Sequence, residues 1–168
     1  RKFFEHLVFP ENYWYEDSII AHLVVPRANS IYMVSKCQYA YRSNPTGITK
    51  TSVNSLRAIE SFYITDLMLH SYVHFYSEDV TNTQEFINLL IEQFYLNEKR
   101  VIRLNSEIKR TIFMYQCKYV HTLPIMDLKL EFSKKLYAIG LLKNNYQIAQ
   151  IGLRLDILNK IIRRIKNK

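Results

Sequence analysis

The distribution of proline and glycine constrains the fold of this 168-residue chain more than any other feature of its sequence. Only 3 glycines and 4 prolines occur, and Pro124 is the single proline after residue 50. Because these two residue types end helices and form tight turns, their scarcity favours long helices. We therefore predict a mainly helical α/β chain, with loops, a helix and a few strands in residues 1–50 and a helical region in residues 51–168.

The spacing of apolar residues gives the expected elements. A helix should begin near Asp17, where acidic groups suit the first turn, and end near Pro26. Alternating and β-branched residues predict strands over 30–35 and 36–42. After residue 50, periodicity predicts five helices, the second capped by Thr81 or Asn82, over about 53–77, 84–95, 98–119, 126–142 and 145–165.

Composition and charge exclude several classes of protein. Hydrophobic residues make up 48% of the chain, which excludes disorder as the main state. The longest stretch without a charged residue, 67–77, is far shorter than the roughly 18 to 20 residues that span a bilayer. Two cysteines, Cys37 and Cys117, form neither a disulfide framework nor a zinc site alone, so reduced thiols in the cytoplasm are expected. The net charge of +8 suits phosphorylated ligands or anionic lipid, and no nucleic-acid-binding motif accompanies it.

The most informative segment combines aromatic rings with carboxylates. Tyr13, Trp14 and Tyr15 directly precede Glu16 and Asp17. Aromatic faces can stack on sugar rings, and a carboxylate can accept a proton from a sugar hydroxyl, so the segment is a candidate carbohydrate site. The alternative is that the two acids only cap the helix and interact with its dipole.

A longer pattern surrounds this segment. Phe9-Pro10-Glu11 precedes Tyr15-Glu16-Asp17, and Tyr39-Ala40-Tyr41-Arg42 follows after an apolar helix and a predicted strand, with Gly47-Ile48-Thr49 beyond it. This order resembles the carboxy-terminal half of the catalytic domain of family-2 glycosyltransferases, which have the Rossmann-like GT-A fold. The resemblance covers about the first 50 residues, and residues 51–168 correspond only to a generic helical tail.

The resemblance implies a function and roles for individual residues. Family members transfer a sugar, with inversion, from a nucleotide-sugar donor to a glycan or lipid-linked acceptor, often in polysaccharide and cell-envelope synthesis. By that likeness, Asp17 is the general base, and Glu16 is the neighbouring catalytic residue that positions the acceptor or the base. The candidates for substrate binding are Trp14, Tyr15, Tyr41 and Arg42. Among these, Arg42 would lie near the diphosphate of the donor.

Two departures from the family pattern affect this interpretation. Gly47 stands where the family usually has serine, which removes a hydroxyl from that loop. No Asp-x-Asp motif occurs, although in the family it holds a divalent metal (Mg or Mn) and the sugar nucleotide. We therefore expect no metal or cofactor in this chain, which would be a fragment inactive alone, and place the metal with a nucleotide-binding half that precedes it.

Two helical features outside this pattern have alternative interpretations. Asp66, His70, His74 and Glu78 recur every four residues and would share one helix face. They form either a solvated polar stripe or a metal site, and the spacing lacks the glutamate of the known two-histidine zinc motif. Residues 145–168 combine an apolar stripe with a basic face, which suits either packing on the domain or peripheral binding to an anionic membrane, at the cytoplasmic face. The functional alternative to a glycosyltransferase is thus a non-catalytic helical module that docks on a membrane or a partner.

Overall fold

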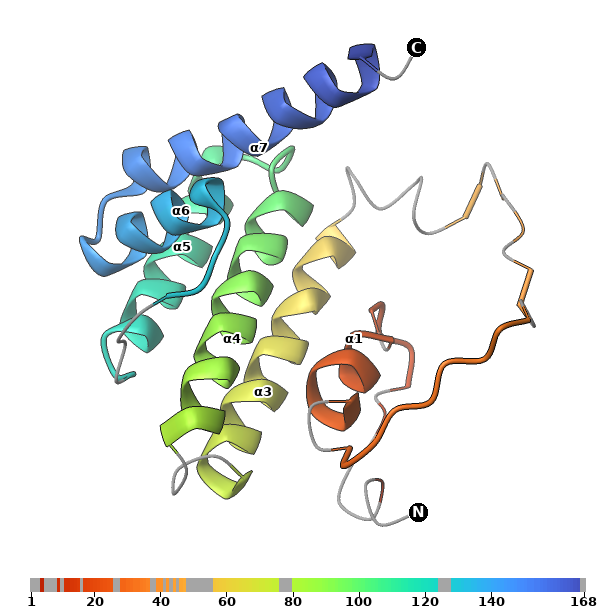
Figure 1. Cartoon of the computed structure of the whole chain (residues 1–168). Helices are drawn as coiled ribbons and strands as arrows, with labels where there is room; N and C mark the ends of the chain where they lie inside the picture. Colours follow the sequence, from red (N-terminus) through yellow and green to blue (C-terminus); the bar gives the residue numbers. More distant parts are fainter. Residues whose placement is uncertain are drawn as a thin grey trace.

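We describe a computed structural model of the chain (Figure 1). It describes residues 4, 9, 11–15, 17–25, 28–36, 39–40, 42, 44, 46–47, 56–75, 80–123 and 128–166. The first helical piece consists of α1 (Asp17–Ile19), which continues as the π-helical turn η2 (Ile20–Val24). The 3₁₀ turn η5 (Leu56–Glu60) leads into the main helices, which are α3 (Ser61–Phe75), α4 (Val80–Arg100), α5 (Ser106–Val120), α6 (Phe132–Leu142) and α7 (Tyr146–Lys166).

The core lies around α4, which is the central helix of the bundle (Figure 1). Its apolar side chains recur at helical spacing and are all buried: Phe86, Ile87, Leu90, Ile91 and Phe94. The antiparallel neighbour α3 contributes Ile64 and Met68 to the same cluster, and the short first helix contributes Ile19 and Leu23. The N-terminal helix is therefore packed on the bundle and buries its apolar side in the common core.

A buried polar network fixes α3 against α4. The Asn97 side-chain amide donates to Thr65 Oγ1 at 2.7 Å, and the Gln93 amide donates to Asn97 Oδ1 at 2.8 Å. Gln93 also donates to the Ser61 carbonyl across the same interface. These side chains are fully buried, so sliding one helix along the other would leave polar groups without partners.

Two glycines allow α6 and α7 to approach closely. A Cβ atom on Gly140 would lie 2.5 Å from the backbone nitrogen of Ala149. A Cβ atom on Gly152 would lie 2.8 Å from the backbone nitrogen of Tyr137, so neither position has room for a larger residue. The connecting turn places Asn144 in the left-handed region at φ 51°, and the Asn145 side chain accepts a hydrogen bond from Ile148 N–H.

The structure confirms the mainly helical character but corrects the predicted strands. Residues 30–35 and the described part of 36–42 form no strand, although 31–34 are rich in residues typical of strands. The segment is extended and solvated, with Tyr32 89% and Met33 95% exposed. A strand requires hydrogen bonds to a neighbouring strand, and no strand occurs among the residues that the structure describes.

Helix boundaries also differ from the prediction. The helices expected over 84–95 and 98–119 are instead α4 and α5, which meet at the turn 101–105. Neither Thr81 nor Asn82 caps α4, because the helix begins at Val80. Asn105 ends the turn and caps α5, since its Oδ1 atom accepts Ile108 N–H at 2.8 Å. The helix expected from about 126 begins at Phe132.

Candidate functional site

Three consecutive aromatic residues of the predicted site are held by side chains from the helical region. The Tyr13 ring packs on that of Tyr63 in α3, with centroids 5.0 Å apart. Trp14 donates its backbone N–H to Glu60 at 2.7 Å. Tyr15 lies beneath the guanidinium of Arg100 at the end of α4. We call this arrangement, Tyr13–Tyr15 with its helical partners, the aromatic clamp.

Glu60 and Arg57 form the centre of the aromatic clamp. The Arg57 Nε atom donates to Glu60 Oε1 at 2.7 Å, and a second guanidinium nitrogen donates to the Asn12 carbonyl. The same guanidinium lies 4.7 Å above the Trp14 ring, a cation–π contact. The Arg57 bond, supported by the Trp14 N–H, lowers the pKa of the Glu60 carboxyl below its ordinary value.

Arg100 forms the third contact of the clamp. Its guanidinium carbon lies 3.8 Å from the centroid of the Tyr15 ring. Tyr15 has a left-handed backbone at φ 71°, a conformation that costs a tyrosine energy and here turns the chain into α1. Burial lowers the pKa of Arg100, while the charges of Tyr15 and Asp17 oppose that shift. Arg100 therefore ties the aromatic segment to the end of α4.

Asp17 is the first residue of α1, and its side chain is exposed. The turn before it is closed by a hydrogen bond from Ser18 N–H to the Tyr15 carbonyl at 3.0 Å. The clamp thus fixes the backbone immediately before an accessible carboxylate. Such a group can accept a proton from a hydroxyl that binds beside it.

The structure brings together only part of the predicted site. Trp14, Tyr15 and Asp17 are adjacent, and the first two are half-buried. Arg42 is exposed, and the described residues from 28 onward leave the short first helix and run away from it (Figure 1). Glu16 and Tyr41 lie outside the described residues.

Sequence reasoning missed the residues that hold the clamp: Arg57, Glu60, Tyr63 and Arg100. They lie in the region predicted as a generic helical tail, and no motif links them to the aromatic segment. The Trp14–Glu60 bond joins residues 46 positions apart. Only the folded chain shows that this tail contributes to the site.

One residue of the predicted polar stripe, Asp66, forms a hydrogen bond between two helices. The Tyr115 hydroxyl donates to Asp66 Oδ1 at 2.8 Å and so ties α5 to α3. His70 is exposed, and the side chains of His74 and Glu78 are not described. Within the ranges that the structure describes, no three His, Cys, Asp or Glu side chains are grouped as metal ligands.

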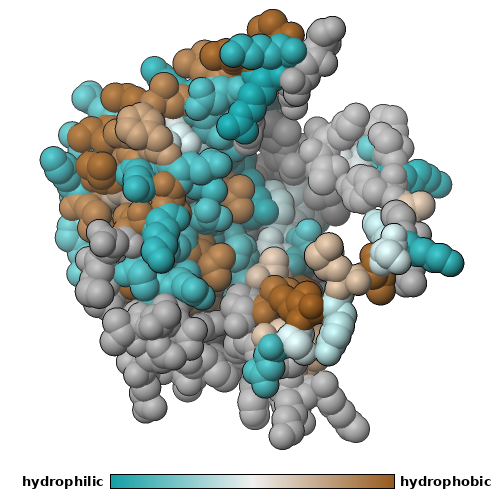
Figure 2. Space-filling view, viewed as in Figure 1, coloured by the Kyte–Doolittle hydropathy of each residue, from teal (hydrophilic) through white to brown (hydrophobic). Residues whose placement is uncertain are grey.

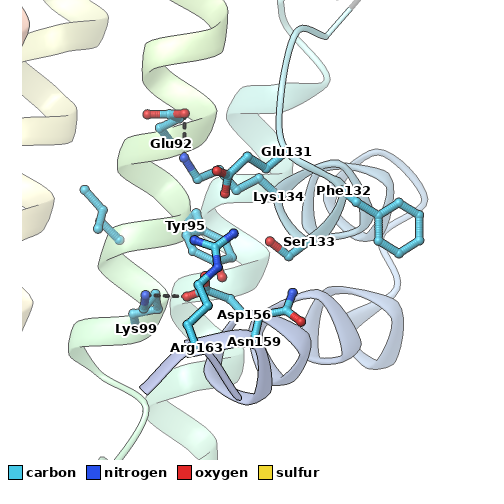
Figure 3. Close-up of a pocket in the computed structure, with 11 residues that line it drawn as sticks. Glu92, Tyr95, Lys99, Glu131, Phe132, Ser133, Lys134, Asp156, Asn159 and Arg163 are labelled. Atoms are coloured by element: carbon cyan, nitrogen blue, oxygen red, sulfur yellow. Dashed lines mark hydrogen bonds and ion pairs between the residues drawn. The ribbon is translucent and has the colours of Figure 1, made fainter. Parts of the chain in front are cut away.

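A polar cleft of about 540 Å³ lies elsewhere, between α4, α6 and α7 (Figure 3). Ion pairs at 2.7 Å join Lys99 to Asp156 and Lys134 to Glu92 along its walls. Burial, with the neighbouring Asp156 carboxylate, raises the pKa of Tyr95. None of the sequence-predicted site residues lines this cleft. The cleft is lined by equal numbers of acidic and basic side chains and therefore has no excess charge of either sign. Its ion pairs connect α4 to α6 and to α7.

Comparison with known proteins leaves the chain without an assigned family. No protein-family model matches it, and neither a curated protein nor a solved structure shows significant similarity to it. Among the helices of the described ranges, none has the length and apolarity required to cross a membrane.

Proposed function

We propose that this chain is the carboxy-terminal part of an inverting family-2-like glycosyltransferase of the GT-A type. The enzyme would transfer a sugar from a nucleotide-sugar donor to a glycan or lipid-linked acceptor in cell-envelope polysaccharide synthesis, on the cytoplasmic side of the membrane. The observation that carries the proposal is the exposed Asp17 carboxylate at the first position of α1, directly after the clamped aromatic segment.

In this proposal Asp17 is the general base. It removes the proton of the acceptor hydroxyl while that oxygen forms a bond to the anomeric carbon of the donor. The bond from the anomeric carbon to the diphosphate oxygen breaks on the opposite face, and the nucleoside diphosphate leaves with the electron pair. A single base is sufficient, because one direct displacement inverts the configuration.

The aromatic clamp supports a positioning role for the residues around Asp17. Arg57 covers Trp14 and Arg100 covers Tyr15, so neither ring has that face open to a sugar. These contacts instead hold the backbone that positions the Asp17 carboxylate. Such positioning matters because a displacement of a catalytic group by about 1 Å can lower the rate of a reaction roughly 100-fold.

The extended segment 28–36 fits a chain that adds to a larger sheet. Its large apolar side chains are solvated, and it lacks a neighbouring strand among the described residues. Exposed segments of this composition pair readily with a sheet edge. In the proposed enzyme this edge belongs to the nucleotide-binding half. In the proposed enzyme Mg or Mn would bind with the donor in that half.

The test replaces Asp17 by Asn in an enzyme that contains this chain and its nucleotide-binding half. Donor binding should persist while transfer falls by about 10² to 10⁴, the usual contribution of proton transfer. Glu16→Gln should cost less, and the matched control Glu11→Gln, an exposed acid six residues earlier, should leave transfer unchanged. Near-normal transfer by the Asp17→Asn enzyme would refute the base assignment. No transfer from any nucleotide sugar by the parent enzyme would refute the function.

A further inference from the structure

Only the first half of α7 packs on the bundle. The buried positions of this helix are Ala149, Gly152 and Leu153, all of which face α6. From residue 157 to residue 166, every side chain that the structure describes is exposed. In Figure 1 this end of α7 runs past the ends of α3 and α4. Asn159 and Arg163 of these turns line the cleft with α4 and α6, and none of the described side chains of the turns is buried.

The side of α7 that points away from the bundle is aliphatic. Ile151, Leu158, Ile162 and Ile165 follow one another at spacings of seven, four and three, which places them on one face of the helix. Ile161 lies beside them, and exposure ranges from 48% at Ile161 and Ile162 to 69% at Ile165. We call these five residues the α7 apolar face. Brown and teal surfaces alternate along this edge of the molecule (Figure 2).

Charge on the terminal turns has a single sign. Asp156 is the only acidic residue of α7, and its carboxylate is paired with Lys99 at 2.7 Å on the bundle side. After it, Arg163 and Lys166 are exposed. The sequence adds Lys160, Arg164 and Lys168 and no further acid. Arg163 lines the cleft beside acidic residues, but the end of the helix as a whole combines an aliphatic face with an excess of positive charge.

We propose that the carboxy-terminal half of α7 docks on an anionic membrane surface, lying in the plane of the headgroups. The α7 apolar face would enter the boundary between headgroups and acyl chains, with the cations at the lipid phosphates. This combination is the one that characterises interfacial helices. Charge complementarity selects the occupant: the face carries aliphatic side chains without hydrogen-bonding groups, and every charged residue after Asp156 is cationic. The inference stands without the proposed glycosyltransferase activity.

The first arm of the test measures the charge requirement by flotation of the 168-residue chain with vesicles. Binding is expected to vesicles that contain phosphatidylglycerol and not to phosphatidylcholine alone. Replacing Arg163, Arg164 and Lys166 together by Gln should weaken partitioning on the order of 100-fold, since each cation near such a surface contributes about fivefold. The control replaces three exposed lysines outside α7 by Gln (Lys118, Lys129 and Lys135) and should retain most binding.

The second arm measures the apolar requirement. Leu158, Ile162 and Ile165 are replaced together by Ser, and binding at physiological salt should fall at least tenfold, because each buried aliphatic side chain stabilises insertion. The control Met114→Ser and Ile139→Ser changes exposed apolar residues of α5 and α6 and should bind normally. Unchanged circular dichroism is expected for all variants, since the replaced side chains lie outside the core.

Two results would overturn the proposal. One is vesicle binding that is equally strong with and without anionic lipid and is unchanged in both α7 variants. The other is absence of vesicle binding together with a doubled mass in solution that the Ser variant abolishes, which would make the α7 apolar face an interface between copies of the chain.

Discussion

Outside the short first helix, the segment before residue 48 and the helical region after residue 55 use their large aromatic and apolar side chains in opposite ways. In the helical region these side chains fill a core, and Phe86, Phe94 and Tyr137 are almost completely buried. In the early segment Tyr32, Met33 and Tyr39 are solvated, while Tyr13–Tyr15 are held from outside by helical side chains. The helical region is thus organised by its own packing, whereas the candidate site is organised by another part of the chain.

The largest expected effect comes from removing a buried side chain of the helical region and comparing the loss of stability with that of a substitution in the early segment. Phe94→Ala should destabilise the chain by about 3 to 5 kcal/mol, because it removes a fully buried ring and leaves a cavity. Tyr32→Ala, in the extended segment, should change stability by less than about 0.5 kcal/mol. Urea unfolding followed by circular dichroism measures both. A similar loss for the two variants would contradict the comparison.

A second effect concerns the pH dependence of the helical core. Burial raises the pKa of Glu98 to about 8, and its Oε1 atom accepts from the Gln116 amide at 3.2 Å. The folded state therefore favours the protonated acid, whereas the unfolded chain ionises near pH 4.3. The stabilisation that protonated Glu98 contributes should be complete below that pH and fall by several kcal/mol as pH rises to about 8, at about 1.36 kcal/mol per pKa unit.

Glu98→Gln is the control for this pH dependence. The amide cannot ionise, so denaturant midpoints of this variant should stay level between about pH 5 and pH 8 while the parent declines. A parent chain whose midpoint rises over the same interval would show that Glu98 is ionised and paired in the folded state.

The close contact of α6 with α7 gives a third effect. Gly152→Ala should destabilise the chain by about 1 to 3 kcal/mol, because the added methyl group meets backbone atoms of α6 that cannot move aside singly. Ile151→Ala, one residue earlier and exposed, is the matched control and should be nearly neutral. Thermal unfolding measures both, and a neutral Gly152→Ala would mean that the helices separate at no cost.

The smallest effect tests the aromatic clamp and leaves the core intact. Glu60→Gln should loosen residues 12–15, at a cost of about 1 kcal/mol or less for this partly exposed group. Trp14 is the only tryptophan, so its fluorescence reports the clamp directly. Because the folded pKa of Glu60 is lowered, the parent clamp is intact above the ordinary glutamate pKa and is lost as pH falls through the lowered value.

The Glu60→Gln chain should show the altered tryptophan emission already at neutral pH, with unchanged helical circular dichroism. Lys118→Gln removes a charge at an exposed site in α5 and should leave the emission as in the parent. Emission that is insensitive to both pH and Glu60→Gln would mean that the clamp does not depend on this carboxylate.

Sequence reasoning succeeded where structure is local. Periodicity predicted the helical character and the carboxy-terminal helix nearly to its ends, since an apolar stripe at helical spacing is sufficient to indicate a helix. It failed over the described residues of 30–42, where β-rich residues lack a partner strand among the described residues, and at the turn 101–105, which contains neither glycine nor proline. The adjacency of Asp17 to the aromatic residues was visible in the sequence. Arg100 was not, because only the packing of the short first helix on the bundle brings it to Tyr15.

The separation of the clamp residues along the chain also sets an order of assembly. Tyr13–Tyr15 are synthesised early, and Glu60, which receives the Trp14 N–H, follows 46 residues later. At about 5 to 20 residues per second, the aromatic segment waits roughly 2 to 9 s on the ribosome before Glu60 exists. The contacts of α6 with α7, by contrast, span a three-residue turn and close as soon as both helices emerge. During synthesis Asp17 is therefore presented before the residues that hold it, and the site is completed only after α4 has been made.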